Sequence, residues 1–259
     1  MTKERTPGVE SARRVLKILL MFSEDKPELT VDDVMAAHGI SQTSAYRYLS
    51  LLRELRLIQL RTRGSYVLTP RVQRLAAASE DTVSLEHAAM PSLRRLSEQF
   101  NETAFLMRRA RNEAIFVASA EPDRALALSF RPGSASVLHR GAVAKVLLAY
   151  SSHRFQRAYI DRHVSDLDER ERLMKEMEHV RLVGHSESLA EVDEGIWGGA
   201  VPVLLEDTVI ASLSIAGPEF RIPPSRRAKI IDELKIGADE IAREYESELE
   251  GVGGYGSDR

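Results

Sequence analysis

The chain has 259 residues, 43% of them hydrophobic, and a formal net charge of −3 at pH 7. This length accommodates a small domain and a medium-sized one, each with its own core. Because the sequence contains no cysteine, disulfides, thiolate metal sites and cysteine nucleophiles are excluded. We recognise no apolar run of transmembrane length and no signal peptide, and we therefore expect a cytoplasmic protein without a membrane partner.

Residues 11–79 have the pattern of a small helical domain, preceded by a polar, flexible arm at residues 1–10. An apolar stripe predicts a first helix, which we expect Ser11 to cap. A second helix begins after Thr30, because Thr30 and Asp33 have the spacing of a capping box, and it ends at Gly39. The stripe of the first helix consists of Ala12, Val15, Leu16, Leu19 and Phe22.

A third helix, beginning at Ser41, follows the glycine-containing turn, and this order is typical of a helix-turn-helix. One face is apolar, with Ala45, Leu49, Leu52 and Leu55 at helical spacing. The other face carries hydrogen-bonding groups that suit phosphates and base edges, although many amphipathic surface helices share that property. The predicted DNA contacts of this helix are Ser41, Gln42, Thr43, Ser44, Tyr46 and Arg47.

Two short strands, at residues 57–60 and 65–69, are predicted after this helix and would form a wing. Arg61 and Arg63 lie in the connection between them and are further predicted DNA contacts. Residues 41–74 contain seven arginines and one acid, Glu54, a local balance of +6 on an acidic chain. Neutralisation of DNA phosphates would explain this clustering, although a solvated arginine face is the alternative for several of these residues.

The remaining sequence predicts a second domain at residues 101–250. A hinge around 80–82 and a linker helix at 85–100, which contains Pro91, would connect it to the first domain. Residues 251–259 would be a flexible tail. Within the second domain we predict strands at 103–108, 114–120, 125–130, 197–205 and 208–215, and helices at 141–150, 168–180 and 225–249.

The start of the predicted helix at 141–150 is a candidate anion site. Backbone N–H groups between Leu138 and Val143 would point into any cavity before the helix and could receive a carboxylate. The alternative is an ordinary buried helix start, whose N–H groups are satisfied by water or by a cap.

Several long motifs resemble the IclR family of bacterial transcriptional regulators. In the first domain they are SARRVLKILLMF, LTVDDVMAAHGISQTSAYRYLSLLRELRLI and GSYVLTPRVQRLA; in the second they are LHRGAVAKVLLAY, VGHSESLAEVDEGIWGGAVPV and ASLSIAGPEFRI. The resemblance implies an α+β chain with a winged helix-turn-helix and a GAF/PAS-like α/β effector-binding domain. It also implies a near-palindromic double-stranded DNA operator, a small organic acid as effector, and self-association as a dimer or a dimer of dimers.

The resemblance also implies an effector site in the second domain. Aligned motifs place the family's effector contacts on the backbone at Ala142 and Val143 and on Ser188, Gly198, Ser214 and Ala216. Family members commonly carry an acid near Ser188 and polar side chains near Gly198 and Ala216, so this pocket would be less polar. Leu128 would supply an apolar wall. Trp197 would lie at or beside the pocket, although core packing is an equal alternative.

An enzyme and a protein-interaction module are the two alternatives to a regulator. An enzyme is disfavoured because the seven histidines are scattered and no catalytic motif, metal site or cofactor site is recognisable. Gly251, Gly253 and Gly256 match a dinucleotide-binding spacing, but no strand precedes them and no helix follows. A winged-helix module for protein interactions remains the second alternative. We therefore predict a ligand-responsive transcriptional regulator, either repressor or activator, with no catalytic residue, metal or cofactor.

Overall fold

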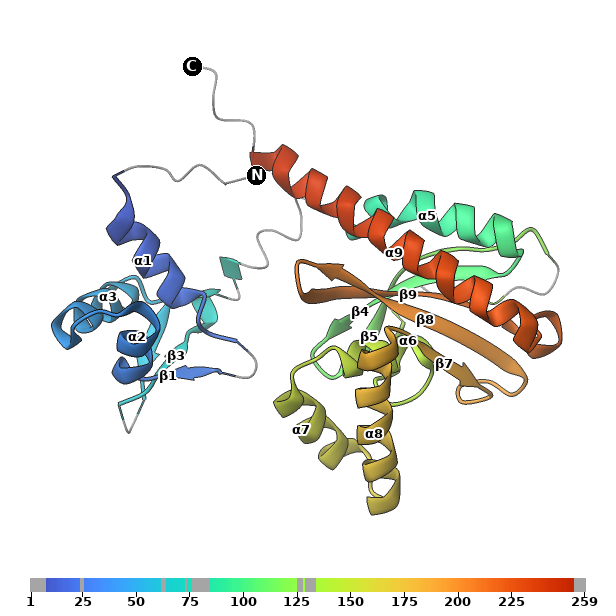
Figure 1. Cartoon of the computed structure of the whole chain (residues 1–259), viewed down its shortest axis with the longest axis horizontal. Coiled ribbons are helices and arrows are strands. Elements are labelled where there is room, and N and C mark those ends of the chain that lie inside the picture. The colour runs from blue at the N-terminus through green and yellow to red at the C-terminus, as the bar shows by residue number, and fades with distance from the viewer. Residues whose placement is uncertain are drawn as a thin grey trace. The chain divides into compact units, whose positions relative to one another are not determined.

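The computed structural model divides the chain into two compact units, residues 1–81 and residues 82–259. The structure describes residues 8–23, 26–61, 64–72, 74–75, 84–124, 128 and 134–253. In the part of the chain just given, the first unit has helices and a small sheet, and the second has a six-stranded sheet with helices on both faces (Figure 1).

The helices of the first unit are α1 (Glu10–Leu19), α2 (Val31–His38) and α3 (Gln42–Glu54). Residues 70–72 and 74–75 are also helical. The expectation that Ser11 caps α1 was wrong: Val9 occupies the cap position, without a side-chain hydrogen bond. Because the helix begins at Glu10, the Ser11 hydroxyl lies inside the first turn, where Glu10 is favourably placed at the positive end of the helix dipole.

The boundaries of α2 and α3 follow the predicted capping residues. Thr30 and Asp33 form a reciprocal capping box, with the Thr30 N–H donating to Asp33 Oδ2 at 2.8 Å. Gly39 ends α2 in the left-handed conformation, at φ +58°, which glycine adopts at little cost. The Ser41 hydroxyl caps α3 by accepting a hydrogen bond from the Ser44 N–H. The helix-turn-helix is therefore confirmed element by element.

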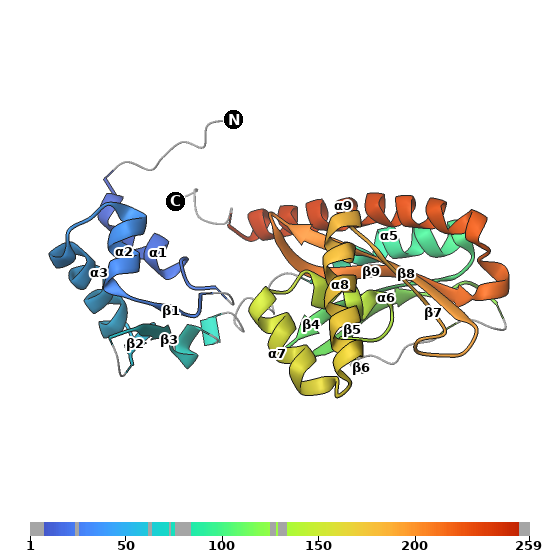
Figure 2. The same ribbon diagram turned by 60° about the horizontal axis from the view of Figure 1, so that its bottom comes forward.

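One apolar cluster joins the three helices to the small sheet. Figure 2 shows the ribbons of these helices and of this sheet. The predicted stripes were only partly correct, because Leu16 is 58% exposed and Leu55 is 45% exposed. Ile18, which was not predicted, is fully buried instead of Leu16 and sets the orientation of α1. The buried members are Val15, Ile18, Val34, Ala45, Leu49, Leu52, Ile58 and Tyr66.

The wing strands form as predicted and are joined by a third strand. β2 (Ile58–Leu60) and β3 (Tyr66–Leu68) pair antiparallel, and β1 (Glu28–Leu29) pairs with the free edge of β3. The sheet order is β1-β3-β2. Two residues are too few to show an alternating pattern, which is why β1 was not recognisable in the sequence.

The sheet of the second unit is antiparallel throughout, in the order β6-β5-β4-β9-β8-β7. Of the strand expected at 125–130, only Leu128 is described, and it has no strand conformation. The edge strands β6 and β7 were not predicted; both are short. The strands are β4 (Thr103–Ala110), β5 (Glu113–Ala120), β6 (Ala135–Val137), β7 (Ser186–Leu189), β8 (Ile196–Leu205) and β9 (Thr208–Pro218).

Two long helices, α5 (Leu85–Phe100) and α9 (Pro224–Gly253), lie side by side over one face of this sheet (Figure 1). The predicted linker helix α5 has the expected ends, but it packs against α9, β4 and β5 and belongs to the second unit. Because α9 continues to Gly253, the first three residues of the expected flexible tail are helical. Glu219–Arg221 forms a short 3-10 turn before α9.

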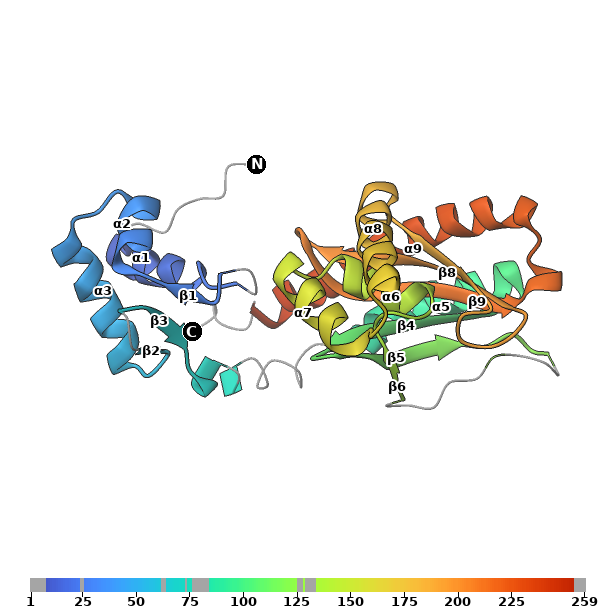
Figure 3. The same cartoon turned by 90° about the horizontal axis from the view of Figure 1, so that it is seen from below.

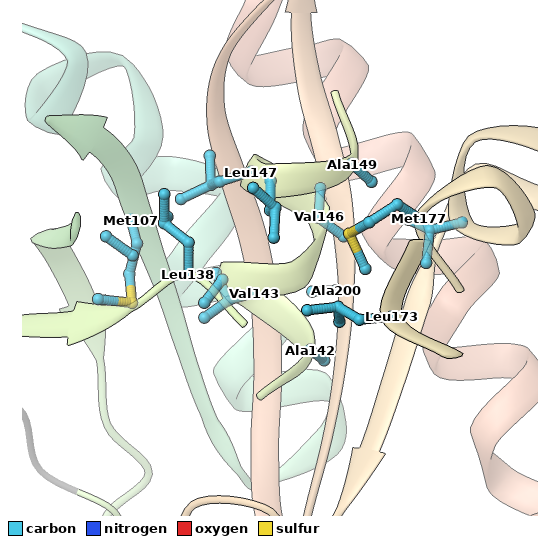
Figure 4. Close-up of a cluster of buried hydrophobic side chains, with 14 of the residues drawn as sticks. Met107, Leu138, Ala142, Val143, Val146, Leu147, Ala149, Leu173, Met177 and Ala200 are labelled. Atoms are coloured by element: carbon cyan, nitrogen blue, oxygen red, sulfur yellow. The ribbon is translucent and has the colours of Figure 1, made fainter. Parts of the chain in front are cut away.

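The opposite face carries α6 (Ala142–Ala149), α7 (His153–His163) and α8 (Leu167–Val183), seen from below in Figure 3. The sequence predicted α6 and α8 but not α7, whose composition is mostly polar. Side chains of α6 are buried between Met107 of β4 and Leu173 and Met177 of α8 (Figure 4).

Successive side chains of β8 point to opposite faces of the sheet and contribute to two separate cores. Trp197, Val201 and Val203 face α9, whereas Gly198 and Ala200 face α6. A shift of one residue would exchange these two sets, so this register decides which side chains line the space beside α6. Within the described residues, no helix has the length and apolar character needed to cross a bilayer.

Candidate functional site

The exposed face of α3 presents the predicted base-contacting groups together. Gln42, Thr43, Tyr46 and Arg47 are all exposed, because the buried residues Ala45, Leu49 and Leu52 turn the opposite face into the core. Short polar, aromatic and guanidinium groups on one accessible helix face suit the donor and acceptor pattern of a major groove.

Ser41 and Ser44 have a structural role at the start of α3. The Ser41 hydroxyl donates to Ser44 Oγ at 3.1 Å and accepts from the Ser44 N–H, so both side chains help to form the cap. They position the first turn of α3, and with it the neighbouring Gln42 and Thr43.

Arg61 is held at the edge of the wing sheet. Its guanidinium donates to Glu28 Oε1 of β1 at 2.7 Å, and Ser65 donates to the other oxygen of the same carboxylate. Because both partners of this ion pair are more than 40% exposed, it is open to exchange with a phosphate. Arg63 lies outside the described residues.

An arginine-lined groove extends the basic surface beyond the C-terminal end of α3. It has a volume of about 650 Å³, and within the described part of the chain no carboxylate is paired with its guanidinium groups. The local excess of arginine was visible in the sequence, but their convergence was not, because Arg71 and Arg74 come from a separate segment. The four arginines are Arg53, Arg56, Arg71 and Arg74.

A cavity of about 260 Å³ lies between the start of α6 and the facing strands of the second unit. It brings together seven of the eight predicted effector residues, which come from five separate segments of the chain. These are Leu128, Ala142, Val143, Ser188, Gly198, Ser214 and Ala216.

Trp197 is the exception, and its expected place at the pocket was wrong. The side chain is fully buried in the other core, and Nε1 donates to Glu187 Oε2 at 2.9 Å. Arg227 lies over the ring, 5.6 Å from its centroid. Because successive residues of a strand face opposite ways, Gly198 at the cavity requires Trp197 to face α9.

The sequence did not identify several other residues that line the cavity. Phe105 and Met107 alternate along β4 and face the cavity together, whereas Val192 and Ile196 come from the connection between β7 and β8 and from the start of β8. Because Phe105 and Met107 are two residues apart on a predicted strand, they could have been placed on one face, but β4 is buried on both faces and its sequence does not show which face lines the cavity. Nothing local in the sequence indicates that the β7–β8 connection reaches α6.

The N–H groups at the start of α6 are partly occupied, as in the alternative of an ordinary buried helix start and not as in a free anion site. The Gly141 N–H donates to Glu191 Oε2 at 2.9 Å, and the Ala142 N–H donates to Ser188 Oγ at 3.0 Å. Val143 lines the cavity and follows these two residues in the first turn. The helix start is thus capped by the chain's own side chains.

Small residues hold the cavity walls close together. A Cβ added at Gly198 would lie 3.3 Å from Ser188 Oγ and 3.8 Å from the Cβ of Ala216. The Ser214 hydroxyl donates to the Gly199 carbonyl at 2.8 Å, which fixes its position in the wall. The cavity therefore combines apolar walls with a few fixed hydroxyl and N–H groups, a composition typical of small-molecule sites.

Comparison with known proteins assigns both units of the chain to one family. Residues 11–61 match the family model of the IclR helix-turn-helix domain, and residues 77–243 match that of the bacterial transcriptional regulator IclR C-terminal domain. The chain belongs to the IclR family. It is accordingly a DNA-binding transcriptional regulator of a family modulated by small-molecule effectors, and not an enzyme.

Relatives of this IclR-family chain align over nearly its full length. The HTH-type transcriptional regulator KipR of Bacillus subtilis is 26% identical over 87% of this chain and 93% of its own. An IclR-family regulator from Rhodococcus shares the fold with a TM-score of 0.64, at 22% identity over 94% of this chain and 97% of its own.

One related structure contains a small molecule. An IclR homolog from Microbacterium hydrocarbonoxydans, complexed with 4-hydroxybenzoate, has a TM-score of 0.59 to this chain at 19% identity. The alignment covers 92% of this chain and 99% of that one. At this identity the similarity establishes the shared α+β fold.

Proposed function

We propose that this IclR-family regulator binds a near-palindromic operator as a homodimer or a dimer of dimers, and that a small organic acid, aliphatic or aromatic, in the second unit modulates this binding. The observation that carries the effector half is the convergence of seven predicted contact residues on one cavity. The DNA half rests on the accessible face of α3 within a family of DNA-binding regulators.

In the proposed complex, α3 enters the major groove. Arg47, Gln42, Thr43 and Tyr46 contact base edges, and Arg61 and Arg63 of the wing contact the backbone or the minor groove. Two such helices related by a two-fold axis enter successive major grooves roughly 34 Å apart, which accounts for a near-palindromic operator.

The size and walls of the cavity support an aromatic acid as the effector. A cavity on the order of 150 Å³ is enough for benzene, so about 260 Å³ leaves room for a ring with a carboxylate. Phe105, Met107 and Leu128 supply apolar walls for the ring, and the hydroxyls of Ser188 and Ser214 supply polar contacts. The effector acts by binding with unequal affinity to two conformations of the chain, only one of which binds the operator well.

Fluorescence anisotropy tests both halves together. Labelled DNA from upstream of the chain's own gene is titrated at two salt concentrations, with and without a panel of organic acids. Salt-sensitive binding that one acid alters supports the proposal. Binding that no acid alters contradicts the effector half. If no duplex is bound, a winged-helix module for protein interactions becomes the better explanation of the first unit.

A further inference from the structure

The segment between β7 and β8 brings a carboxylate to the edge of the cavity where an acidic effector is expected to bind: its partner Gly141 lines the cavity, although the carboxylate's own residue does not. Glu191 lies in this segment, residues 190–195, which we call the β7–β8 loop. Its Oε2 accepts the Gly141 N–H at 2.9 Å, and its Oε1 accepts from Lys145 Nζ at 2.6 Å. One oxygen of a chain carboxylate thus accepts an N–H at the positive end of α6, and the other pairs with a lysine of the same helix.

Lys145 is the buried counterion of this arrangement. Its side chain is 3% exposed, and its ammonium group also contacts Glu176 of α8 at 2.5 Å. A buried ammonium group is strongly destabilising unless it is paired, so the lysine requires at least one carboxylate at all times. Glu176 remains in place if Glu191 leaves, so the ammonium group keeps one carboxylate partner.

Further contacts close the β7–β8 loop over the helix start. Arg140 donates to the Glu191 carbonyl at 2.5 Å. A Cβ added at Gly141 would lie 2.9 Å from Val192 Cγ2, so this side chain covers the beginning of α6 closely. Val192 and Asp193 line the cavity, and hence the same loop forms part of its wall.

We propose that Glu191 is a built-in competitor of the effector: an acid that binds in the cavity displaces it from the Gly141 N–H, which borders that cavity, and so releases the β7–β8 loop. This inference rests on the proposed function, because it assumes that an acid binds in this cavity. Displacement also moves Asp193 away with the loop, which removes a second negative charge from the neighbourhood of the ligand. Glu191 therefore determines which ligands bind. It also couples effector binding in the cavity to the position of the β7–β8 loop.

Isothermal titration calorimetry of the full chain with benzoate and 4-hydroxybenzoate tests the competition. Glu191→Ala should lower the Kd for both acids by about tenfold or more, since a charge-assisted contact no longer has to be broken. Glu191→Gln, which keeps the shape but loses the charge, should lower it by less. The matched control is Glu194→Gln, an exposed position on the same loop, and its Kd should equal that of the parent chain.

Hydrogen exchange provides a second readout. Adding either acid to the parent chain should speed exchange of the loop amides, whereas in Glu191→Ala the loop should exchange rapidly even without acid. Unchanged or weaker acid binding by Glu191→Ala and Glu191→Gln would overturn the inference, and so would the absence of acid binding in all variants. DNA binding is measured on the same preparations. If acid binding contradicts the inference but DNA binding is retained, the chain remains a DNA-binding regulator and only the role of the acid is rejected.

Discussion

Arg47 lies near the middle of the exposed face of α3, one turn after Thr43 and directly after Tyr46. A guanidinium group presents a planar pair of donors, which matches the acceptors of guanine or a phosphate better than any other side chain does. Thr43 and Gln42 are shorter and lie closer to the capped end. At the scale of single residues, base recognition is therefore concentrated on Arg47.

We predict that Arg47→Ala weakens binding to the specific operator by roughly 1–3 kcal/mol, because a bidentate contact is lost. Competition titrations with operator and random duplexes measure this. Arg157→Ala, an exposed arginine on α7, is the control and should leave both affinities unchanged. Equal discrimination between operator and random DNA by Arg47→Ala would remove the residue from base recognition.

We predict that Ser214→Leu abolishes the response to an acid while DNA binding persists, since a leucine side chain would fill the cavity that Ser214 lines. Overpacking typically costs about 1–3 kcal/mol, so thermal unfolding is recorded beside anisotropy. Ser212→Leu, two residues earlier on β9 and outside the cavity lining, controls for that cost. A response retained in Ser214→Leu would place the effector elsewhere.

At the scale of elements, the capping box makes the stability of α2 depend on pH, because one of its two residues is a carboxylate. The Lys26 ammonium group and the hydrogen bonds from Thr30 hold the pKa of Asp33 at about 2, below its ordinary value of 3.8. A carboxyl group whose pKa is lower in the folded state stabilises that state fully above its unfolded pKa. This contribution is lost as pH falls through the folded pKa.

We therefore predict that Asp33→Asn makes α2 less stable at neutral pH, and that the difference from the parent chain narrows between about pH 4 and pH 2. Hydrogen exchange of the α2 amides measures the local opening free energy across this range. Asp32→Asn, at an exposed neighbouring position, is the matched control. A difference that stays constant with pH would mean that the Asp33 charge is not involved.

The wing supplies a prediction about salt dependence. Replacing Arg61 and Arg63 by alanine should make the slope of log affinity against log salt less steep. Since each lost phosphate contact lowers its magnitude by about 0.9, the change should be about 2 at most. Because Arg61 also pairs with Glu28 at 2.7 Å, Glu28→Gln should leave the slope unchanged or steepen it. Anisotropy at several salt concentrations gives the slopes, and an unaltered slope in the double variant would exclude both arginines from the phosphate contacts.

At the scale of the whole molecule, the proposed mechanism requires two copies of α3 in a fixed relation. A dimer places them one helical repeat apart, so inserting about five base pairs between the half-sites should turn them to opposite sides of the duplex and sharply weaken binding. Inserting about ten should restore much of it. Equal affinity for both operators, measured by anisotropy, would contradict binding by a two-fold dimer.

Much of the fold could be predicted because it is encoded locally. Thr30, Gly39 and Ser41 each act within one turn of their own position, and the helical period of 85–100 is complete within α5. The missed strands β1, β6 and β7 have two, three and four residues, so each is defined by its strand partner, whereas the missed helix α7 is mostly polar. Tertiary packing also decided that Ile18, and not Leu16, faces the core.

By itself the sequence determined the helix-turn-helix, the wing and the local excess of arginine around α3, because these depend on spacing within a segment and on side-chain chemistry. The segments that supply the effector cavity followed from the resemblance of their motifs to the IclR family. Only the tertiary structure decided that Trp197 faces away from the cavity, because the register of β8 against its neighbours sets that direction. It alone also brought Glu191 to the start of α6, since fifty residues separate Glu191 from Gly141 and their contact depends on how β7 and β8 are placed beside that helix.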